Sequence, residues 1–278
     1  MFLRRIRRRI GKPSREASQA ERHLWIDKHA PGRSFADVGG LFQLHGEMAY
    51  RAETAGAAEV TLFDSGDEDH MGLAAERRKS RIRFVQGDLE EPESVLRIGP
   101  HDIVWCTGVV YHTPNPVLQL MHLREITREL LFLGSRTIPE IPGFDQACIY
   151  YPNLAESSRR AHSRAYWKPE SLWGIGVPFD DRPMYGHGNM WWGITPSALR
   201  AMLWTARFEI VEERHPHDYP WAVDVVARPV DKEPLLPPRS YFRARGDRDA
   251  RGEELLPFED YYDYARQQGD HTWLRPAE

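Results

Sequence analysis

Short apolar runs alternate with amphipathic stretches along the first half of the chain. The runs are short enough to be buried strands and cover residues 35–38, 59–63, 82–86, 102–106 and 129–133. The stretches around them carry apolar residues at helical spacing and cover residues 14–28, 44–55, 72–79 and 116–127. This alternation predicts a doubly wound α/β domain built on a mostly parallel sheet.

The alternating pattern breaks between Gly134 and Ile194, where Pro, Gly, Tyr and Trp dominate. So long a segment inside a compact domain is typical of an insertion or lid. A helix is predicted again over 196–206, because Thr195 can cap it and Pro196 suits its first position. Two further strands are predicted over 208–212 and 222–227, so the expected sheet has seven strands.

The chain is expected to divide into three parts. Residues 1–30 form a basic N-terminal arm and a helix, and residues 31–228 form the α/β domain, which contains the insertion 134–194. Residues 229–278 are rich in Pro and charge and are predicted as a C-terminal extension with a short helix over 261–266.

The first predicted strand ends in Asp37 and a pair of glycines, Gly39 and Gly40, and the second ends in Asp64. A glycine turn lets a ligand lie against bare backbone, and a carboxylate at the next strand tip can accept hydrogen bonds from both hydroxyls of a ribose. This β-α-β unit therefore predicts a nucleoside-cofactor site.

The glycine loop differs from the dinucleotide pattern G-x-G-x-x-G. Its third glycine is missing at the required spacing, and Leu41 and Phe42 stand where a pyrophosphate needs room. Asp37, directly before this turn, suits a cation better than a phosphate. The pattern favours a cofactor with a cationic amino-acid moiety, such as S-adenosylmethionine (SAM).

Composition and charge narrow the class of protein. The chain is 41% apolar and 28% charged, which is enough to bury a core, and its net charge of −4 argues against nucleic-acid binding over the whole surface. Cys106 and Cys148 form no CxxC pair, so we expect a reducing, cytoplasmic location and no zinc site. No apolar segment is long enough to span a membrane, and the first residues lack the apolar run of a signal peptide.

The first twelve residues, Met1 to Lys12, are rich in arginine. They can be an arm for RNA phosphate or anionic lipid, or a solvated tail, and both interpretations stay open.

Four motifs in order resemble those of class I SAM-dependent methyltransferases. They are Ala36-Asp37-Val38-Gly39-Gly40, Leu62-Phe63-Asp64, Gln86-Gly87-Asp88-Leu89, and the stretch from Asp102 to His112. Gly108-Val109-Val110-Tyr111-His112 with Pro114, and Asn189 to Pro196, resemble motifs of a subgroup. That subgroup includes tRNA wobble-uridine modifying enzymes and natural-product methyltransferases. The resemblance covers roughly residues 34–228.

The resemblance implies a Rossmann-like fold and a role for each motif. Asp37, Gly39 and Gly40 would meet the methionine part of SAM, and Asp64, with Ser65 beside it, would hold the ribose. Asp88 and Leu89 would flank the adenine, and Thr107 and Gly108 would pass close to the sulfonium. Tyr111 and His112 would stand at the mouth of the acceptor pocket.

Methyl transfer needs a general base only where the acceptor must lose a proton. His112 is the best-placed candidate and Tyr111 stands beside it, while the other candidates are Glu140, Glu170, His187 and His215. The residues expected to contact the acceptor are Glu140, Tyr166, His187, Asn189, Trp191 and Trp192. The aromatic residues of the insertion could form a lid over the acceptor or simply pack a cap. The one adjacent Asp pair, Asp180-Asp181, lies in a Pro-rich turn, so no metal is expected.

Three functions remain open at this stage. The first is a methyltransferase for a small-molecule acceptor in a biosynthetic pathway, favoured by the aromatic insertion and the negative net charge. The second is a tRNA-modifying methyltransferase, supported by the subgroup resemblance and the arginine-rich arm. The third is a SAM-binding interaction protein without catalysis.

Overall fold

The computed structural model describes residues 15–41, 44–68, 79–158, 161, 181–182, 189–215 and 222–232. The chain divides into two compact units, Met1–Asp231 and Lys232–Glu278. Apart from Lys232, every described residue belongs to the first unit. The predicted helix over 261–266 and all of the predicted helix over 72–79 except Lys79 lie outside the described residues.

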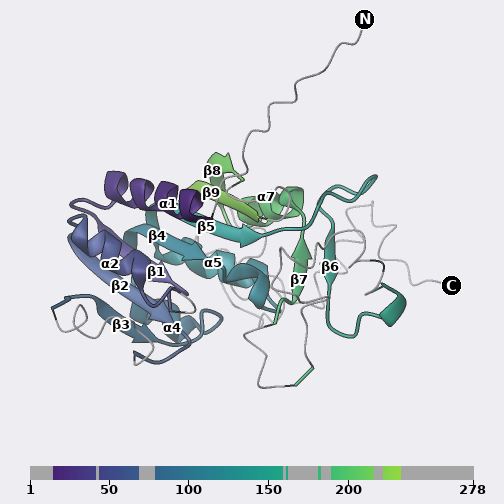
Figure 1. The fold of residues 1–278 in the computed structure, drawn as a ribbon, viewed down its shortest axis with the longest axis horizontal. Helices are drawn as coiled ribbons and strands as arrows, with labels where there is room; N and C mark the ends of the chain where they lie inside the picture. Colours follow the sequence, from purple (N-terminus) through teal and green to yellow (C-terminus); the bar gives the residue numbers. More distant parts are fainter. Residues whose placement is uncertain are drawn as a thin grey trace, which may run out of the picture. The chain divides into compact units, whose positions relative to one another are not determined.

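The first unit is built on a seven-stranded sheet in the order β3-β2-β1-β4-β5-β9-β8 (Figure 1). Its strands are β1 (Ser34–Val38), β2 (Glu59–Asp64), β3 (Arg83–Gln86), β4 (His101–Thr107), β5 (Thr127–Arg136), β8 (Phe208–Arg214) and β9 (Ala222–Pro229). The first five strands pair in parallel, whereas β9 runs antiparallel to both of its neighbours. The predicted α/β class with a mostly parallel sheet is confirmed.

Helices connect the strands, and a second, two-stranded sheet stands apart from the first (Figure 1). The helices are α1 (Arg15–His29), α2 (Glu47–Thr54), α4 (Pro92–Ile98), the 3₁₀ turn η2 (Val110–His112), α5 (Pro116–Ile126) and α7 (Pro196–Thr205). The small sheet pairs β6 (Cys148–Tyr150) with β7 (Trp192–Ile194) in antiparallel fashion. No helix in the described ranges combines the length and the apolar character needed to cross a membrane.

Helix ends follow their local sequence signals closely. The Thr195 hydroxyl accepts a hydrogen bond from the Ala198 amide at 3.2 Å, and Pro196 is the first residue of α7. At the end of α2, Gly56 takes a left-handed φ of 95°. Its amide donates to the Glu53 carbonyl, and the Ala57 amide donates to the Ala52 carbonyl. This is the Schellman arrangement that the glycine at position 56 predicts.

Several elements differ from the sequence expectation. Strands β6 and β7 form inside the segment predicted as an insertion, where no strand was predicted. Helix α4 was not predicted; it forms with Val95 and Ile98 buried. Strand β5 continues to Arg136 instead of ending at 133, because Gly134 to Arg136 pair with Asp224 to Ala222 of β9. The first three residues assigned to the insertion therefore belong to the main sheet.

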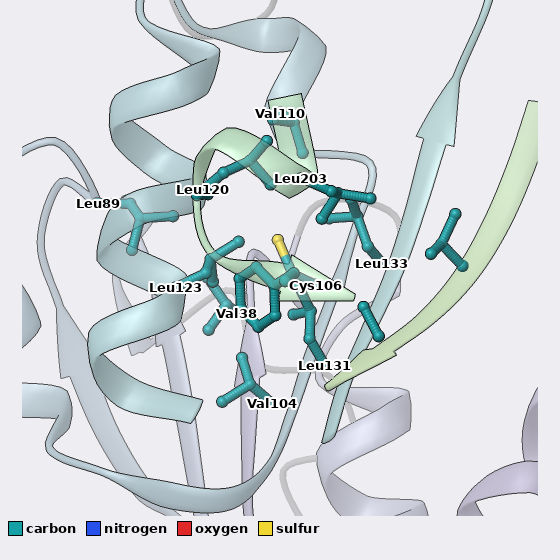
Figure 2. Packing of buried hydrophobic residues seen from close by; sticks show 14 of the residues in the cluster. Val38, Leu89, Val104, Cys106, Val110, Leu120, Leu123, Leu131, Leu133 and Leu203 are labelled. Carbon is teal, nitrogen blue, oxygen red and sulfur yellow. The ribbon is translucent and has the colours of Figure 1, made fainter. Parts of the chain in front are cut away.

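The sheet alternates its side chains between two apolar cores. On β4, Ile103 and Trp105 lie in the core on the side of α1 and α2. Val104 and Cys106 lie in the other core, where Figure 2 shows them facing Leu120 and Leu123 of α5. This period of two is the one expected for a strand buried on both faces.

Helix α1 packs on the first of these cores. Its Trp25 and Ile26 are buried there, and the Trp25 ring contacts the Phe132 ring with centroids 5.2 Å apart. The helix grouped with the N-terminal arm thus contributes to the core of the sheet unit. The domain boundaries at residues 30 and 228 stay predictions.

Candidate functional site

The carboxyl ends of the parallel strands form the edge at which the motif residues gather. Asp37 lies near the end of β1, Asp64 ends β2 and Thr107 ends β4, and β1 pairs with both of the other strands. The strand order reverses between β1 and β4, and ligands of open α/β sheets bind at such a switch point.

The Asp37 carboxyl group is buried and only 1% exposed. Its Oδ2 accepts a hydrogen bond from the Ala49 amide of α2 at 3.2 Å. Burial raises the pKa of this group to about 7; the Ala49 bond opposes the rise, and the negative charges of Asp64 and Glu47 add to it. A carboxylate held in this way has a strong preference for a nearby cation.

The structure gives a different reason from the sequence for the glycine at position 40. A Cβ there would stand 2.3 Å from Asp37 Oδ2 and 2.8 Å from the Leu62 side chain. Contacts within the protein therefore exclude a larger residue at this position whether or not a ligand lies on the loop. Gly39 takes a left-handed φ of 77°, and a Cβ there would overlap Val109.

The Asp64 carboxylate ties the two loops of the predicted cofactor site together. Its Oδ2 accepts from the Leu41 amide and its Oδ1 from the Gly66 amide, both at 2.9 Å. Each oxygen keeps a second lone pair, so the carboxylate can still accept hydrogen bonds from hydroxyl groups. Ser65 beside it is exposed, and its carbonyl accepts from the Gln86 side chain at 3.3 Å.

The comparison with the dinucleotide pattern puts Leu41 where a ligand would need room. The structure differs at this residue. Its side chain is 3% exposed and packs in the core beside α1 and α2. Its amide is directed to Asp64, so the backbone at this point faces the loop and the side chain faces away. Phe42 lies outside the described residues.

Asp88 and Leu89 have structural contacts that the motif alone does not reveal. Asp88 Oδ1 accepts a hydrogen bond from the Glu90 amide at 2.9 Å, which stabilises the turn before α4. Leu89 is buried among the residues of Figure 2, and its carbonyl is hydrogen-bonded by His122 Nδ1 at 2.6 Å. A contact of either residue with adenine stays a prediction.

The turn after β4 presents Gly108, Tyr111 and His112. Gly108 is exposed with a left-handed φ of 80°, and its amide donates to the Gly134 carbonyl at 2.9 Å. His112 Nδ1 lies 2.7 Å from the Asn189 carbonyl. Because a carbonyl only accepts, Nδ1 carries the proton, and a neutral ring leaves the lone pair of Nε2 to accept another.

The surroundings of the His112 ring favour its neutral form. Burial lowers its pKa most, the hydrogen bond to Asn189 opposes this, and the positive charge of Arg136 lowers the pKa further. A neutral imidazole with a defined tautomer at the carboxyl end of β4 has the properties of a general base. Whether it acts on an acceptor stays a prediction.

Three hydrogen bonds fasten the segment Asn189 to Trp192 onto this turn. Besides the bond from His112, the Trp191 amide donates to the Tyr111 carbonyl at 2.9 Å, and Trp192 Nε1 donates to the Pro114 carbonyl at 3.1 Å. On its other side β7 pairs with β6, and Tyr150 packs on Trp192 with ring centroids 4.7 Å apart. The segment therefore holds the turn in position, while a contact of these residues with an acceptor remains a prediction.

The other acceptor and base candidates are spread over the chain. Glu140 is exposed and bridges to Ser197 at the start of α7, with Oε1 2.8 Å from the amide and Oε2 2.7 Å from the hydroxyl. His215 follows β8, and its Nδ1 lies 3.3 Å from the Ala222 carbonyl. Tyr166, Glu170 and His187 lie outside the described residues.

Two arginines near Tyr111 were missed by the sequence analysis. Arg136, the last residue of β5, hydrogen-bonds the Tyr111 side chain. Arg22 of α1 forms two hydrogen bonds with the buried Asp224, at 2.6 and 3.1 Å. Burial raises the pKa of Tyr111, and both arginines oppose that rise. Only the extension of β5 beyond residue 133 would have pointed to Arg136.

No set of three His, Cys, Asp or Glu side chains within the described ranges is arranged to hold a metal ion.

A scan of protein families finds no match to this sequence, and a search of curated proteins finds none either. Solved structures do match its fold. One is 1,6-didemethyltoxoflavin-N1-methyltransferase from Burkholderia thailandensis, with bound 1,6-didemethyltoxoflavin and S-adenosylhomocysteine (SAH). It is 15% identical with a TM-score of 0.50, and the match covers 78% of this chain and 80% of that one.

Two further structures are similar to the same degree. The N-terminal domain of EvdMO1, in the presence of SAH and D-fucose, is 15% identical with a TM-score of 0.51 and covers 79% of this chain and 85% of that one. A putative methyltransferase from Bacillus halodurans is 16% identical with a TM-score of 0.50 and covers 77% of this chain and 100% of that one. The chain therefore has the Rossmann-like fold of the class I methyltransferases.

Proposed function

We propose that the chain is a SAM-dependent methyltransferase that acts on a small-molecule acceptor in a biosynthetic pathway. The observation that carries the proposal is the arrangement of Asp37 and Asp64 at the tips of β1 and β2, across the switch point from the neutral His112 after β4. Acids at one side suit a cationic nucleoside cofactor, and a neutral imidazole at the other suits an acceptor that must lose a proton.

The described residues fit SAM at the chemical level. Asp37 would face its charged amino-acid part, because a buried carboxyl group gains most from a cation that replaces lost solvent. Asp64 would accept hydrogen bonds from the ribose hydroxyls with the lone pairs that are not used by the Leu41 and Gly66 amides. Gly108, directly after β4, is exposed, and within 4 Å a Cβ there would meet only the Tyr111 hydroxyl, at 3.7 Å.

When bound, SAM supplies an electrophilic methyl group, whose bond to sulfur breaks with the electron pair left on sulfur as the acceptor atom bonds to carbon. The protein's part is to align the acceptor and to keep water out. His112 Nε2 takes the acceptor's proton, since Nδ1 already donates its own to Asn189. The segment Asn189 to Trp192 keeps the His112 ring oriented.

A small molecule is the acceptor that the available observations favour. The similar structure from Burkholderia thailandensis was solved with the small molecule 1,6-didemethyltoxoflavin, and the net charge of −4 does not favour RNA. Closure of the remaining insertion, 137–194, over the acceptor is part of this proposal; residues 159–160, 162–180 and 183–188 of it lie outside the described residues.

Calorimetry with SAH and labelled-methyl transfer from SAM test this proposal. Asp64→Ala should weaken SAH binding at least tenfold, because hydrogen bonds to a charged group contribute roughly 1.5–3 kcal/mol each. Asp102→Asn is the matched control. Asp102 lies near the start of β4, away from the carboxyl ends of the strands, and is hydrogen-bonded to Ser34. Unchanged affinity in Asp64→Ala would refute the ribose assignment, and tight SAH binding without transfer to any acceptor would favour an interaction protein.

A tRNA acceptor is the second candidate, supported by the arginine-rich first twelve residues. Its test compares tRNA binding by the full chain and by a chain lacking residues 1–12 across a salt series. Salt-sensitive binding that is lost with the arm and is coupled to methyl transfer would establish this function in place of the first.

A further inference from the structure

Glu90 connects two loops that follow different strands of the main sheet. It comes directly after Leu89, in the candidate adenine loop behind β3. Its Oε1 accepts a hydrogen bond from the Thr113 hydroxyl, and its Oε2 accepts one from the Asn115 side-chain amide at 2.6 Å. Both partners follow His112 in the turn after β4. Because β2 and β1 separate β3 from β4 in the sheet, this carboxylate links the loops of two strands that are not neighbours.

The Thr113 hydroxyl lies at the centre of this connection. The residue is buried, and besides donating to Glu90 its oxygen accepts from the Asn115 amide at 2.9 Å. A hydroxyl has a single proton, so donation to the carboxylate leaves its lone pairs for the amide. Asn115 is the residue before α5, and Glu90 therefore holds the short segment that leads from His112 into that helix.

The loop behind β3 is itself held in place, which makes Glu90 a firm support. The Glu90 amide donates to Asp88 Oδ1 at 2.9 Å, and the Leu89 carbonyl accepts from His122 Nδ1 of α5 at 2.6 Å. The segment Asn189 to Trp192 holds the turn after β4 independently of Glu90. Removal of the Glu90 carboxylate should therefore loosen this turn without detaching it.

We propose that Glu90 is a positioning residue for His112, the candidate general base. By holding the two side chains that follow the base, it keeps the His112 ring in place against the Asn189 carbonyl. The inference rests on the proposed methyltransferase function, because it concerns the base of that reaction. Hydrogen bonds to a carboxylate are stronger than those between neutral groups, so two of them can fix a short turn. An imidazole keeps one tautomer while the partner of its protonated nitrogen stays in place, so movement of the turn would change which nitrogen is free to accept a proton.

NMR of the histidine ring nitrogens, recorded on the full-length protein without ligand across a pH series, tests this role. The signal of His112 is assigned by its absence in His112→Gln. In the wild type the proton should be on Nδ1 and the pKa should lie below 6.5. In Glu90→Ala a second form with the proton on Nε2 should appear, and the pKa should move toward 6.5, because the ring is less confined and less buried.

Two variants serve as controls for the chemistry and for the location. Glu90→Gln should restore the wild-type signal, since its amide oxygen can accept from Thr113 and the Asn115 amide can turn its oxygen toward the new donor. Glu91→Ala removes the neighbouring acid, which accepts from the Ser94 hydroxyl of α4 at 3.4 Å, and should leave the His112 signal unchanged. If Glu90→Ala does not fold, Thr113→Val replaces it, because it removes the same hydrogen bond with little change of shape.

Calorimetry with SAH on each protein separates this inference from the proposed function. A folded Glu90→Ala protein with the wild-type tautomer and pKa of His112 would overturn the positioning role and leave the cofactor proposal standing. An equal change in Glu91→Ala would overturn it as well, since the effect would then not belong to the bridge. Failure of the wild type to bind SAH would overturn both proposals.

Discussion

The buried Asp37 carboxyl group should reduce the stability of the fold at neutral and higher pH. Its pKa rises from an ordinary value of 3.8 to about 7, mainly because of burial. The folded state then binds more protons than the unfolded state between about pH 4 and 7, so stability falls as the pH rises through this window. A shift of about three pH units corresponds to roughly 4 kcal/mol at pH 8, as an upper bound.

Asp37→Asn removes the titration and keeps an oxygen for the Ala49 amide. The variant should match the wild type near pH 4 and become more stable by up to about 4 kcal/mol at pH 8. At the same time it should weaken SAM binding at least tenfold, because the cationic moiety loses its counter-charge. The trade of stability for binding is the behaviour expected of a functional carboxylate.

Urea denaturation of both proteins at pH 4, 6 and 8 measures the effect. Asp102→Asn is a control in which the effect on stability has the opposite sign. The hydrogen bond from the Ser34 amide is the main cause that lowers the pKa of Asp102. Asp102 therefore stabilises the fold at pH 8, and this contribution is lost as the pH falls through the folded pKa. An Asp37→Asn protein that is no more stable than the wild type at pH 8 would refute the argument.

Three further changes test other parts of the site. His112→Gln should lower kcat about a hundredfold with SAH affinity unchanged, and full activity would leave His112 only a packing role. Because the pKa of His112 is lowered, the acid limb of the wild-type pH–rate profile should lie below pH 6.5. Gly40→Val should lower the unfolding temperature even without ligand, since its Cβ meets Asp37; a variant as stable as the wild type would contradict the contact. Arg22→Met should lower the free energy of unfolding by up to about 3–5 kcal/mol in chemical denaturation, because the buried Asp224 would keep only Arg214, 3.6 Å away, as a charged partner. A loss below about 1 kcal/mol would count against Arg22 as the main partner of this carboxylate.

Local sequence signals were sufficient for much of the fold and for placing the candidate cofactor residues at the ends of their strands. The strands of the parallel sheet can be recognised in the sequence because buried strands need continuous apolar runs. The helix at 196–206 can be recognised because Thr195 and Pro196 are typical of a helix start. Asp37, Gly39, Gly40 and Asp64 could be located because strand tips and tight turns lie within a few residues of each other in sequence.

The candidate acceptor end depends on contacts between distant segments, which no local pattern encodes. His112 acquires its tautomer from Asn189, 77 positions away, and Arg136 belongs to the main sheet because β5 pairs with β9 as far as Ala222. Sequence alone could name His112 as a candidate but could not decide its protonation or its neighbours. The pKa of a side chain and the length of a strand follow from burial and long-range pairing, so the tertiary structure decided both.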